Sequence, residues 1–533
     1  MNARHLSLPR EAGQRAVFLL AASVILLPVL TAVWFGFTQG GGDSWDHILN
    51  NRLLPYTITT VVMLVMVGAL CLLFAVPAAW LVSRYHFPGR TIFSWALILP
   101  LAVPGYVMAY VWADLTDVFG PLQTPFRNMT GLAARDYMFP DVFNLPGLSF
   151  VLASTLFPYV YITARAAFSQ QSLCTLEAAR SLGASAWSCF LRVAIPAARP
   201  AIVAGLALAL MEAAADYGAA DFLGIQTLGV GIVRSWNSFG EPATAARLAL
   251  VLIFIAFVFL SLERFSRGKQ GTEQTSGRWR SPEPQVLDGL SAIFATIFCC
   301  VLLLITFVVP VARLLWLSVE LREVMPDITG PLISTLILAT GGTLFALLCA
   351  LALTLSTRTS GRQLSSLASA AGYAAPGTVL ALGAVLLLAS VNIPLAGPFA
   401  IFILIWLYAS RFTAAGAGPL EAALLRAPNS INSAARSLGV SKTKRLLSID
   451  LPLLRPGVFA GLLILFVETL KELPATLMLR PFGWDTLAVE AHKYAFDERL
   501  AQAVMPSLLI TLAGLAPVLL LSWQMSRSRR LND

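Results

Sequence analysis

The sequence contains two copies of one segment, 256 residues apart. Residues 177–196 read EAARSLGASAWSCFLRVAIP, and residues 433–452 read SAARSLGVSKTKRLLSIDLP. In each copy a proline stands 13 positions after the glycine of A-A-R-S-L-G. An internal repeat at nearly half of the chain length indicates two versions of one structural module.

Composition places these modules in a membrane. The chain is 57% hydrophobic and only 12% charged, whereas soluble domains carry roughly 25% charged residues. Uncharged runs of about 18 residues or more predict membrane-spanning helices. We therefore expect an all-α polytopic membrane protein with about twelve transmembrane helices, six in each module. They are predicted near 17–37, 57–83, 91–113, 147–170, 199–222 and 244–263, and then near 290–318, 331–357, 367–390, 397–413, 456–479 and 504–525.

The basic residues predict the orientation of these helices. With the N-terminus in the cytoplasm, about 26 of the 37 Lys and Arg residues fall on the cytoplasmic side, as the positive-inside rule requires. Both chain ends are then cytoplasmic, and the two modules form a parallel repeat. The net charge of +9 therefore records membrane sidedness and does not indicate nucleic-acid binding. The cytoplasmic segments are 1–16, 84–90, 165–199, 263–285, 358–362, 411–455 and 526–533.

The repeat also sets the predicted domain boundaries. A polar, basic linker separates the two modules, and a long segment on the cytoplasmic side of each module carries the repeated motif. The parts are the N-terminal tail 1–16, the first module 17–263 with its segment 172–196, the linker 264–289, the second module 290–526 with its segment 428–452, and the C-terminal tail 527–533.

The local physics of the repeated segments predicts a short helix held on the cytoplasmic face. Gly183 can end one helix in a left-handed conformation, and Ser185 can cap a second one. Pro196 is expected to break that second helix before the next span. Gly439 and Pro452 repeat the arrangement in the second module. Such a helix can lie on the lipid surface or enter a groove on a partner, and the residues leave both readings open.

At these residues the sequence resembles a known family. The pattern E-A-A, three residues, G, nine residues, and then a segment ending in proline is the signature of permease subunits of ABC importers. The first copy matches it, and the second departs from it because Ser433 replaces the glutamate. The resemblance implies a type I ABC importer-like fold. It also assigns ATPase coupling to Glu177, Ala178, Ala179, Gly183 and Pro196, and to Ser433, Ala434, Ala435, Gly439 and Pro452.

The same resemblance implies partners. In the family this segment fits a cleft on a cytoplasmic ATPase, so two ATPase copies and a periplasmic binding protein are expected. This chain has no G-x-x-x-x-G-K-[ST] motif and therefore no phosphate-binding loop of that type, which places ATP on the partner. The location implied is the bacterial inner membrane.

The chain looks most like the fused, two-module permeases of iron(III) importers. Iron(III) is therefore the expected substrate, and thiamine or another small solute is the alternative within the class. From a different class, an ion-gradient-driven secondary transporter would also be built from repeats. The segments that carry this resemblance are 99–112, 216–218, 468–476, 485–488 and 497–500.

Four acids lie at corresponding positions of the fifth and eleventh predicted spans. Acids inside a membrane are costly and usually face the interior of a bundle or a polar pathway. Carboxylate oxygens suit a hard cation, and Lys471 is near enough to pair with Glu468. The alternatives are that the acids hold helix ends together or face lipid near the surface. The four are Glu212, Asp216, Glu468 and Glu472.

Two Pro-Gly pairs occupy similar places in the third and ninth predicted spans. Pro104-Gly105 and Pro376-Gly377 remove helix hydrogen bonds inside a span. Such breaks are tolerated where the backbone is buried in protein or lines a cavity. We expect kinks along the transport pathway, with a simple packing kink as the alternative.

No enzyme chemistry is expected. The sequence shows no nucleophile–base or metal-ligand constellation, and its six cysteines and four histidines have no ligand spacing. We therefore expect no catalytic residue, no metal site and no cofactor bound by this chain.

Overall fold

The structure is a computed structural model, and it describes residues 8–171, 181–183, 185–267, 285–322, 326–360, 362–395, 397–426, 437 and 442–530. Within this part of the chain ten helices are long and apolar enough to cross a membrane. Two bent helix pairs raise the number to twelve if each pair is one span. The predicted all-α fold with about twelve spans is confirmed. The domain boundaries stay a prediction, since parts of both tails and most of the linker lie outside the described residues.

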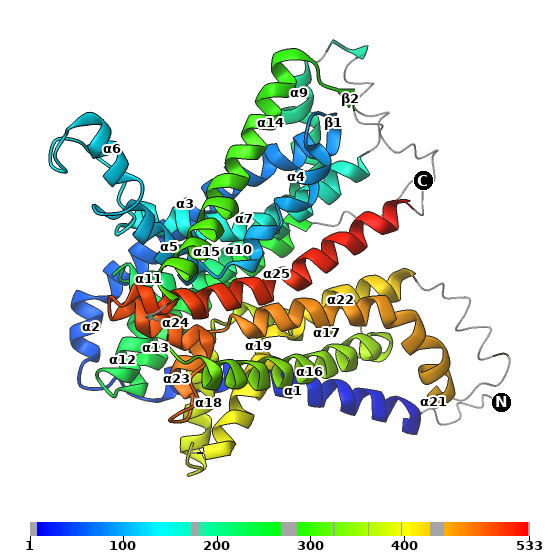
Figure 1. The fold of residues 1–533 in the computed structure, drawn as a ribbon. Coiled ribbons are helices and arrows are strands. Elements are labelled where there is room, and N and C mark those ends of the chain that lie inside the picture. Colours follow the sequence, from blue (N-terminus) through cyan, green and yellow to red (C-terminus); the bar gives the residue numbers. More distant parts are fainter. Residues whose placement is uncertain are drawn as a thin grey trace.

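In Figure 1 the first module is coloured from blue to green, and its first helix, α1 (Leu8–Thr38), lies beside α16 (Thr329–Ser360) of the second module. Its longest helices correspond to the predicted spans, and shorter helices connect them at their ends. The elements are α1 (Leu8–Thr38), α2 (Trp45–Asn51), α3 (Leu53–Arg84), β1 (Tyr85–His86), α4 (Arg90–Ala96), η1 (Leu99–Ala102), α5 (Gly105–Thr116), α6 (Gln123–Thr130), α7 (Leu145–Gln170), α9 (Ala186–Cys189), η2 (Phe190–Ala194), α10 (Ile195–Ala215), α11 (Gly218–Phe222), α12 (Leu228–Asn237) and α13 (Pro242–Arg267).

The second module repeats this order. A two-residue strand, β2, pairs in parallel with β1 just before the module begins. The elements are β2 (Gln285–Val286), α14 (Gly289–Leu303), η3 (Leu304–Val308), α15 (Val309–Glu320), α16 (Thr329–Ser360), α17 (Arg362–Ala374), α18 (Gly377–Ser390), α19 (Gly397–Arg426), α21 (Lys442–Arg445), η5 (Leu446–Asp450), α22 (Leu451–Leu470), α23 (Pro474–Leu479), α24 (Leu487–Phe496) and α25 (Leu500–Arg530).

The first helix of each module packs against the other module. Helix α1 packs along α16, α17, α18 and α19 of the second module, while α14 and α15 pack against α3, α4 and α5 of the first. Pro28 within α1 has no N–H to donate to the carbonyl of Val24. The indole of Trp406 on α19 donates to that carbonyl instead, at 2.8 Å. The exchange joins the two modules into one body.

The third and ninth predicted spans are each divided into two helices. The segments Arg90–Ala102 and Gly105–Thr116 meet at 96°, and Leu367–Ala374 and Gly377–Ser390 meet at 98°. Pro104 and Pro376 stand at the two bends in extended backbone conformation. Each predicted kink is therefore a right-angled elbow between two helices, because proline also disfavours the helical conformation in the residue before it.

The expected break at Pro196 is wrong. Helix α9 continues through the π-helical turn η2 directly into α10, and Pro196 lies in the first turn of α10. The same succession of a π-helical turn and a proline occurs at Pro452 in η5 and α22, and at Pro310 in η3 and α15. The wider turn changes the hydrogen-bonding partners just where proline lacks its N–H, so the helix continues past the proline.

Three other predicted ends are also wrong. Helix α19 runs to Arg426, well beyond the predicted end at 413. Helix α10 stops at Ala215 and α22 at Leu470, so the predicted spans 199–222 and 456–479 are each a long helix followed by a short one. Asp216, directly after α10, and Glu472, two residues after the end of α22, each start the next helix through their side chains, as described below.

Candidate functional site

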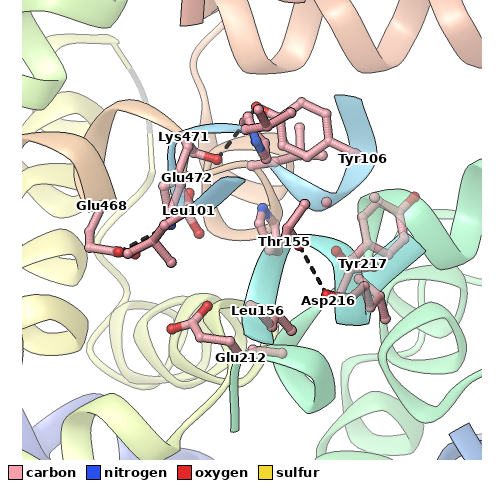
Figure 2. A pocket seen from close by; sticks show the side chains of 18 of the residues that line it. Leu101, Tyr106, Thr155, Leu156, Glu212, Asp216, Tyr217, Glu468, Lys471 and Glu472 are labelled. Atoms are coloured by element: carbon pink, nitrogen blue, oxygen red, sulfur yellow. Dashed lines mark hydrogen bonds and ion pairs between the residues drawn. The ribbon is translucent and has the colours of Figure 1, made fainter. Parts of the chain in front are cut away.

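A polar cavity lies between the two modules at the ends of α10 and α22. Its volume is about 80 Å³, room for several water molecules. Figure 2 shows side chains of both modules around this space. All four predicted acids line it, together with Pro104 and Gly105. The charged lining consists of Glu212, Asp216, Glu468 and Glu472 with Arg411 and Lys471.

Asp216 and Glu472 begin the short helices that follow the two spans. Asp216 accepts hydrogen bonds from the backbone N–H groups of Ala219 (3.1 Å) and Ala220 (3.2 Å). Glu472 accepts from the N–H groups of Ala475 (2.9 Å) and Thr476 (3.1 Å). These bonds satisfy N–H groups that have no partner within the helix. Asp216 therefore lies just beyond α10, not on the helix face shared with Glu212 that we predicted.

Glu468 links the two modules through hydrogen bonds. The ammonium of Lys471 lies 3.0 Å from its Oε1, as the spacing predicted. The phenol of Tyr159, on α7 of the first module, donates to the same oxygen at 3.2 Å. The hydroxyl of Tyr106 donates to the carbonyl of Lys471 across the same boundary, at 3.5 Å. Both acids of the second module are therefore held by direct partners.

Arg411 is the site residue that sequence reasoning missed. The sequence predicts it at the start of a cytoplasmic segment, but it lies within α19 and is 6% exposed. Its Nη2 is 3.4 Å from Glu212 Oε2, and its Nη1 is 3.4 Å from Glu472 Oε1. The sequence does contain a signal for a position inside the membrane, because the apolar span continues beyond Arg411 to Leu424.

The two Pro-Gly elbows lie beside the two helix-starting acids. A Cβ built on Gly105 would stand 3.3 Å from Asp216 Oδ2. A Cβ on Gly377 would stand 2.7 Å from both Glu472 Oε1 and Arg411 Nη1. Each elbow therefore approaches the acid of its own module, and the second one leaves no room for a methyl group. Pro376 and Gly377 are behind the charged side chains and do not line the cavity itself.

The carboxylates do not form a ligand shell. Among the residues that the structure describes, no group of three or more His, Cys, Asp or Glu side chains is arranged to hold a metal ion. The acids are instead engaged with helix N–H groups, Arg411, Lys471 and tyrosine hydroxyls. The cavity can therefore present negative charge to a passing solute without enclosing it. Transport through the cavity stays a prediction.

The coupling residues lie only in part within the described chain. Gly183 has a φ of +84°, as a left-handed helix end requires, and Ser185 Oγ accepts from the N–H of Ser188 at 3.2 Å. Phe190 packs on Trp80 of α3, with 5.2 Å between ring centroids. Trp187 is 67% exposed, which leaves an apolar face uncovered. Outside the described residues lie Glu177, Ala178, Ala179, Ser433, Ala434, Ala435 and Gly439.

Comparison with known proteins agrees with this architecture. Residues 72–269 match the family described as the binding-protein-dependent transport system inner membrane component. An Fe(3+)-transport system permease protein of Haemophilus influenzae is 26% identical over 521 residues, 95% of this chain and 97% of that protein. A sulfate transport system permease protein of Escherichia coli is 25% identical over 259 residues, 47% of this chain and 91% of that protein. A probable molybdenum ABC transporter permease protein of Haloferax volcanii is 30% identical over 245 residues, 45% of this chain and 86% of that protein.

The chain belongs to the permease subunits of ABC transporters, so it is a transport component and a multi-pass protein of the inner membrane. Its particular form within that class is the two-module one. The sulfate and molybdenum relatives match over most of their own length but only about half of this chain, whereas the Fe(3+) relative matches nearly all of it.

Proposed function

We propose that this chain is the permease subunit of an ATP-driven importer and forms the membrane pathway for iron(III) delivered by a periplasmic binding protein. One observation carries the choice of substrate. The Fe(3+)-transport permease of Haemophilus influenzae is similar across both modules, including the boundary where the cavity forms. The sulfate and molybdenum relatives each match about half of this chain, 47% and 45% of it.

The charge of the cavity supports a cation over an oxyanion. Four carboxylates and two basic side chains line it, leaving two negative charges when all are ionised. The first module contributes two acids and no base to this lining. Negative charge near a pathway attracts cations and repels anions such as sulfate, more strongly where water is scarce. Carboxylate oxygens also suit a hard cation.

The exposed face of the first repeated segment supports docking of an ATPase. Leu182 is 89% exposed and Trp187 is 67% exposed, whereas Phe190 anchors the segment to α3. We infer one ATPase copy at segment 172–196 and a second at 428–452, with ATP bound by that partner. Closure of the ATPase pair on ATP would draw the two segments together and open the pathway at the far end. In this arrangement both chain ends are cytoplasmic.

Uptake measurements test the substrate. Cells lacking this chain are compared with wild-type cells for uptake of radiolabelled iron(III), thiamine and sulfate. We expect selective loss of iron uptake, restored by the wild-type chain. Selective loss of thiamine or sulfate uptake would keep the permease class and replace the substrate.

The energy source is tested in the same cells. We expect iron uptake to stop when the partner ATPase is inactivated and to persist when a protonophore collapses the proton gradient while ATP is maintained. Uptake that survives loss of the ATPase but stops with the protonophore would instead identify a secondary transporter.

A further inference from the structure

Arg411 joins the two modules at the cavity. It belongs to α19 of the second module, and its guanidinium reaches Glu212 on α10 of the first module as well as Glu472 of its own. Its side chain is buried, and its guanidinium packs 5.1 Å from the ring centroid of Phe412. Of the ion pairs lining the cavity, the pair with Glu212 crosses between modules, while Lys471 and Glu468 belong to the same helix end.

The charges explain why this pair holds the modules together. At the cavity the first module presents Glu212 and Asp216 without a basic residue. Glu212 therefore depends on the second module for its counter-charge. A largely buried carboxylate such as Glu212, whose side chain is 14% exposed, is disfavoured when it loses its partner unless water or another cation replaces that partner. Separation of the modules at this level requires such a replacement.

The cluster is also incompletely satisfied in this structure. Arg411 Nε and Glu468 Oε2 are buried, and neither has a hydrogen-bond partner among the described residues. Both ion-pair distances of Arg411 are 3.4 Å, longer than the 2.7–2.9 Å usual for such charged hydrogen bonds. Both atoms therefore remain available for another hydrogen-bond partner, and the long Arg411 ion pairs separate at lower cost than close charged hydrogen bonds would.

We propose that Arg411 is an electrostatic latch, which closes the cavity by pairing with Glu212 across the module boundary and releases it when the pathway opens. The latch consists of the Arg411–Glu212 ion pair alone. It acts on access to the cavity and therefore does not depend on which solute is carried.

Access to the cavity can be measured directly in the full-length protein in membrane vesicles. A single cysteine, Thr155→Cys, is placed in the cavity lining, in a chain whose native cysteines are replaced at positions 71, 174, 189, 299, 300 and 349. An uncharged, membrane-impermeant thiol reagent is added without ATP, in right-side-out and inside-out vesicles separately, so that the charge changes of the variants do not themselves attract or repel it. The rate of labelling reports how often the cavity is open to that side.

Glu212→Gln removes the charge that crosses the boundary and keeps the side-chain volume. We expect labelling from one side to become faster by about tenfold, because the closed state loses a stabilising ion pair. Arg411→Gln removes both ion pairs and should accelerate labelling at least as much. Thermal unfolding of each variant in detergent confirms that the protein labelled is folded.

Asp114→Asn is the matched control. It breaks another ion pair between the modules, in which Arg313 on α15 contacts Asp114 on α5 at 2.6 Å, away from the cavity. Its labelling rate should stay within about twofold of the parent chain. The latch is refuted if folded Glu212→Gln is labelled at the parent rate from both sides, or if Asp114→Asn accelerates labelling equally. Neither result depends on iron as the substrate.

Discussion

Asp216 and Glu472 stand at equivalent places in the two modules, and each begins the short helix that follows a span. At the same time both line the cavity between the modules. The two roles depend on different properties of the side chain. Starting a helix requires an acceptor oxygen, whereas attracting a cation requires a charge.

Substitutions at Asp216 separate these roles. Asp216→Asn keeps an acceptor for the N–H groups of Ala219 and Ala220, so stability should be nearly that of the wild type, while iron uptake falls because a cavity charge is lost. Asp216→Ala loses the acceptor as well and should cost about 1 kcal/mol of stability. Thermal unfolding and uptake are measured on both variants. Normal uptake by Asp216→Asn would show that this carboxylate serves only to start the helix.

The glycines of the two elbows provide a second matched pair. Gly377→Ala places a methyl group 2.7 Å from Arg411 Nη1 and Glu472 Oε1, so those charged groups must move apart. Gly105→Ala meets Leu152 at 3.0 Å and Asp216 at 3.3 Å, contacts that small shifts relieve. We expect Gly377→Ala to reduce uptake far more than Gly105→Ala, with both variants well expressed. Equal uptake by the two variants would mean that displacing the Arg411 side chain does not affect transport.

At the scale of elements, the short segment at Gly183 connects the exposed helix α9 to the preceding chain. The φ of +84° is one that residues with a Cβ rarely adopt. No atom lies within 4 Å of a Cβ built there, so space is not the constraint. Only the backbone conformation requires glycine.

Because backbone conformation and not space requires glycine here, two substitutions at Gly183 should give different results. Gly183→Asn should retain much of the transport, because asparagine tolerates the left-handed conformation. Gly183→Val should strain the turn by roughly 1–2 kcal/mol and impair transport while the protein still inserts. ATPase activity of the purified complex and uptake in cells are the measurements. Wild-type transport by Gly183→Val would contradict the docking geometry.

The contact between α1 and the second module can be tested at Pro28 and Trp406. Trp406→Phe removes the indole that donates to Val24, which should cost about 1 kcal/mol because the carbonyl is left without a partner. In a Pro28→Ala background the helix can satisfy Val24 itself, and the same substitution should cost less. Thermal unfolding of the four variants in this double-mutant cycle measures the coupling. Additive effects would show that the bond does not compensate for the proline.

At the scale of the molecule, the repeat and the apolar runs were sufficient to predict the class of fold. The four acids were singled out because charge inside an apolar run is conspicuous, and all four line the cavity. Arg411 was missed for the opposite reason, since a basic residue near an expected helix end is read as a cytoplasmic one. The helix breaks before Asp216 and Glu472 were also missed. Each acid stands four residues after another acid, and that spacing is also the spacing of two residues on one face of an unbroken helix.

The elbows and the π-helical turns show a further limit. A proline in a span predicts a disturbed helix, but not its extent. Pro104 and Pro376 end their helices at right angles, whereas Pro196 and Pro452 lie in continuous ones. Pro196 and Pro452 follow a π-helical turn, whereas Pro104 and Pro376 have ψ values of 148° and 149°, outside the helical range.

The central claim is that one chain, through its two modules, forms the whole pathway and binds two ATPase copies. Native mass spectrometry of the complex purified from its own membranes tests this most directly. The account predicts one copy of this chain with two copies of an ATPase subunit. A complex with two copies of this chain and two ATPase subunits would mean that each chain supplies only half of a transporter, and would contradict the account.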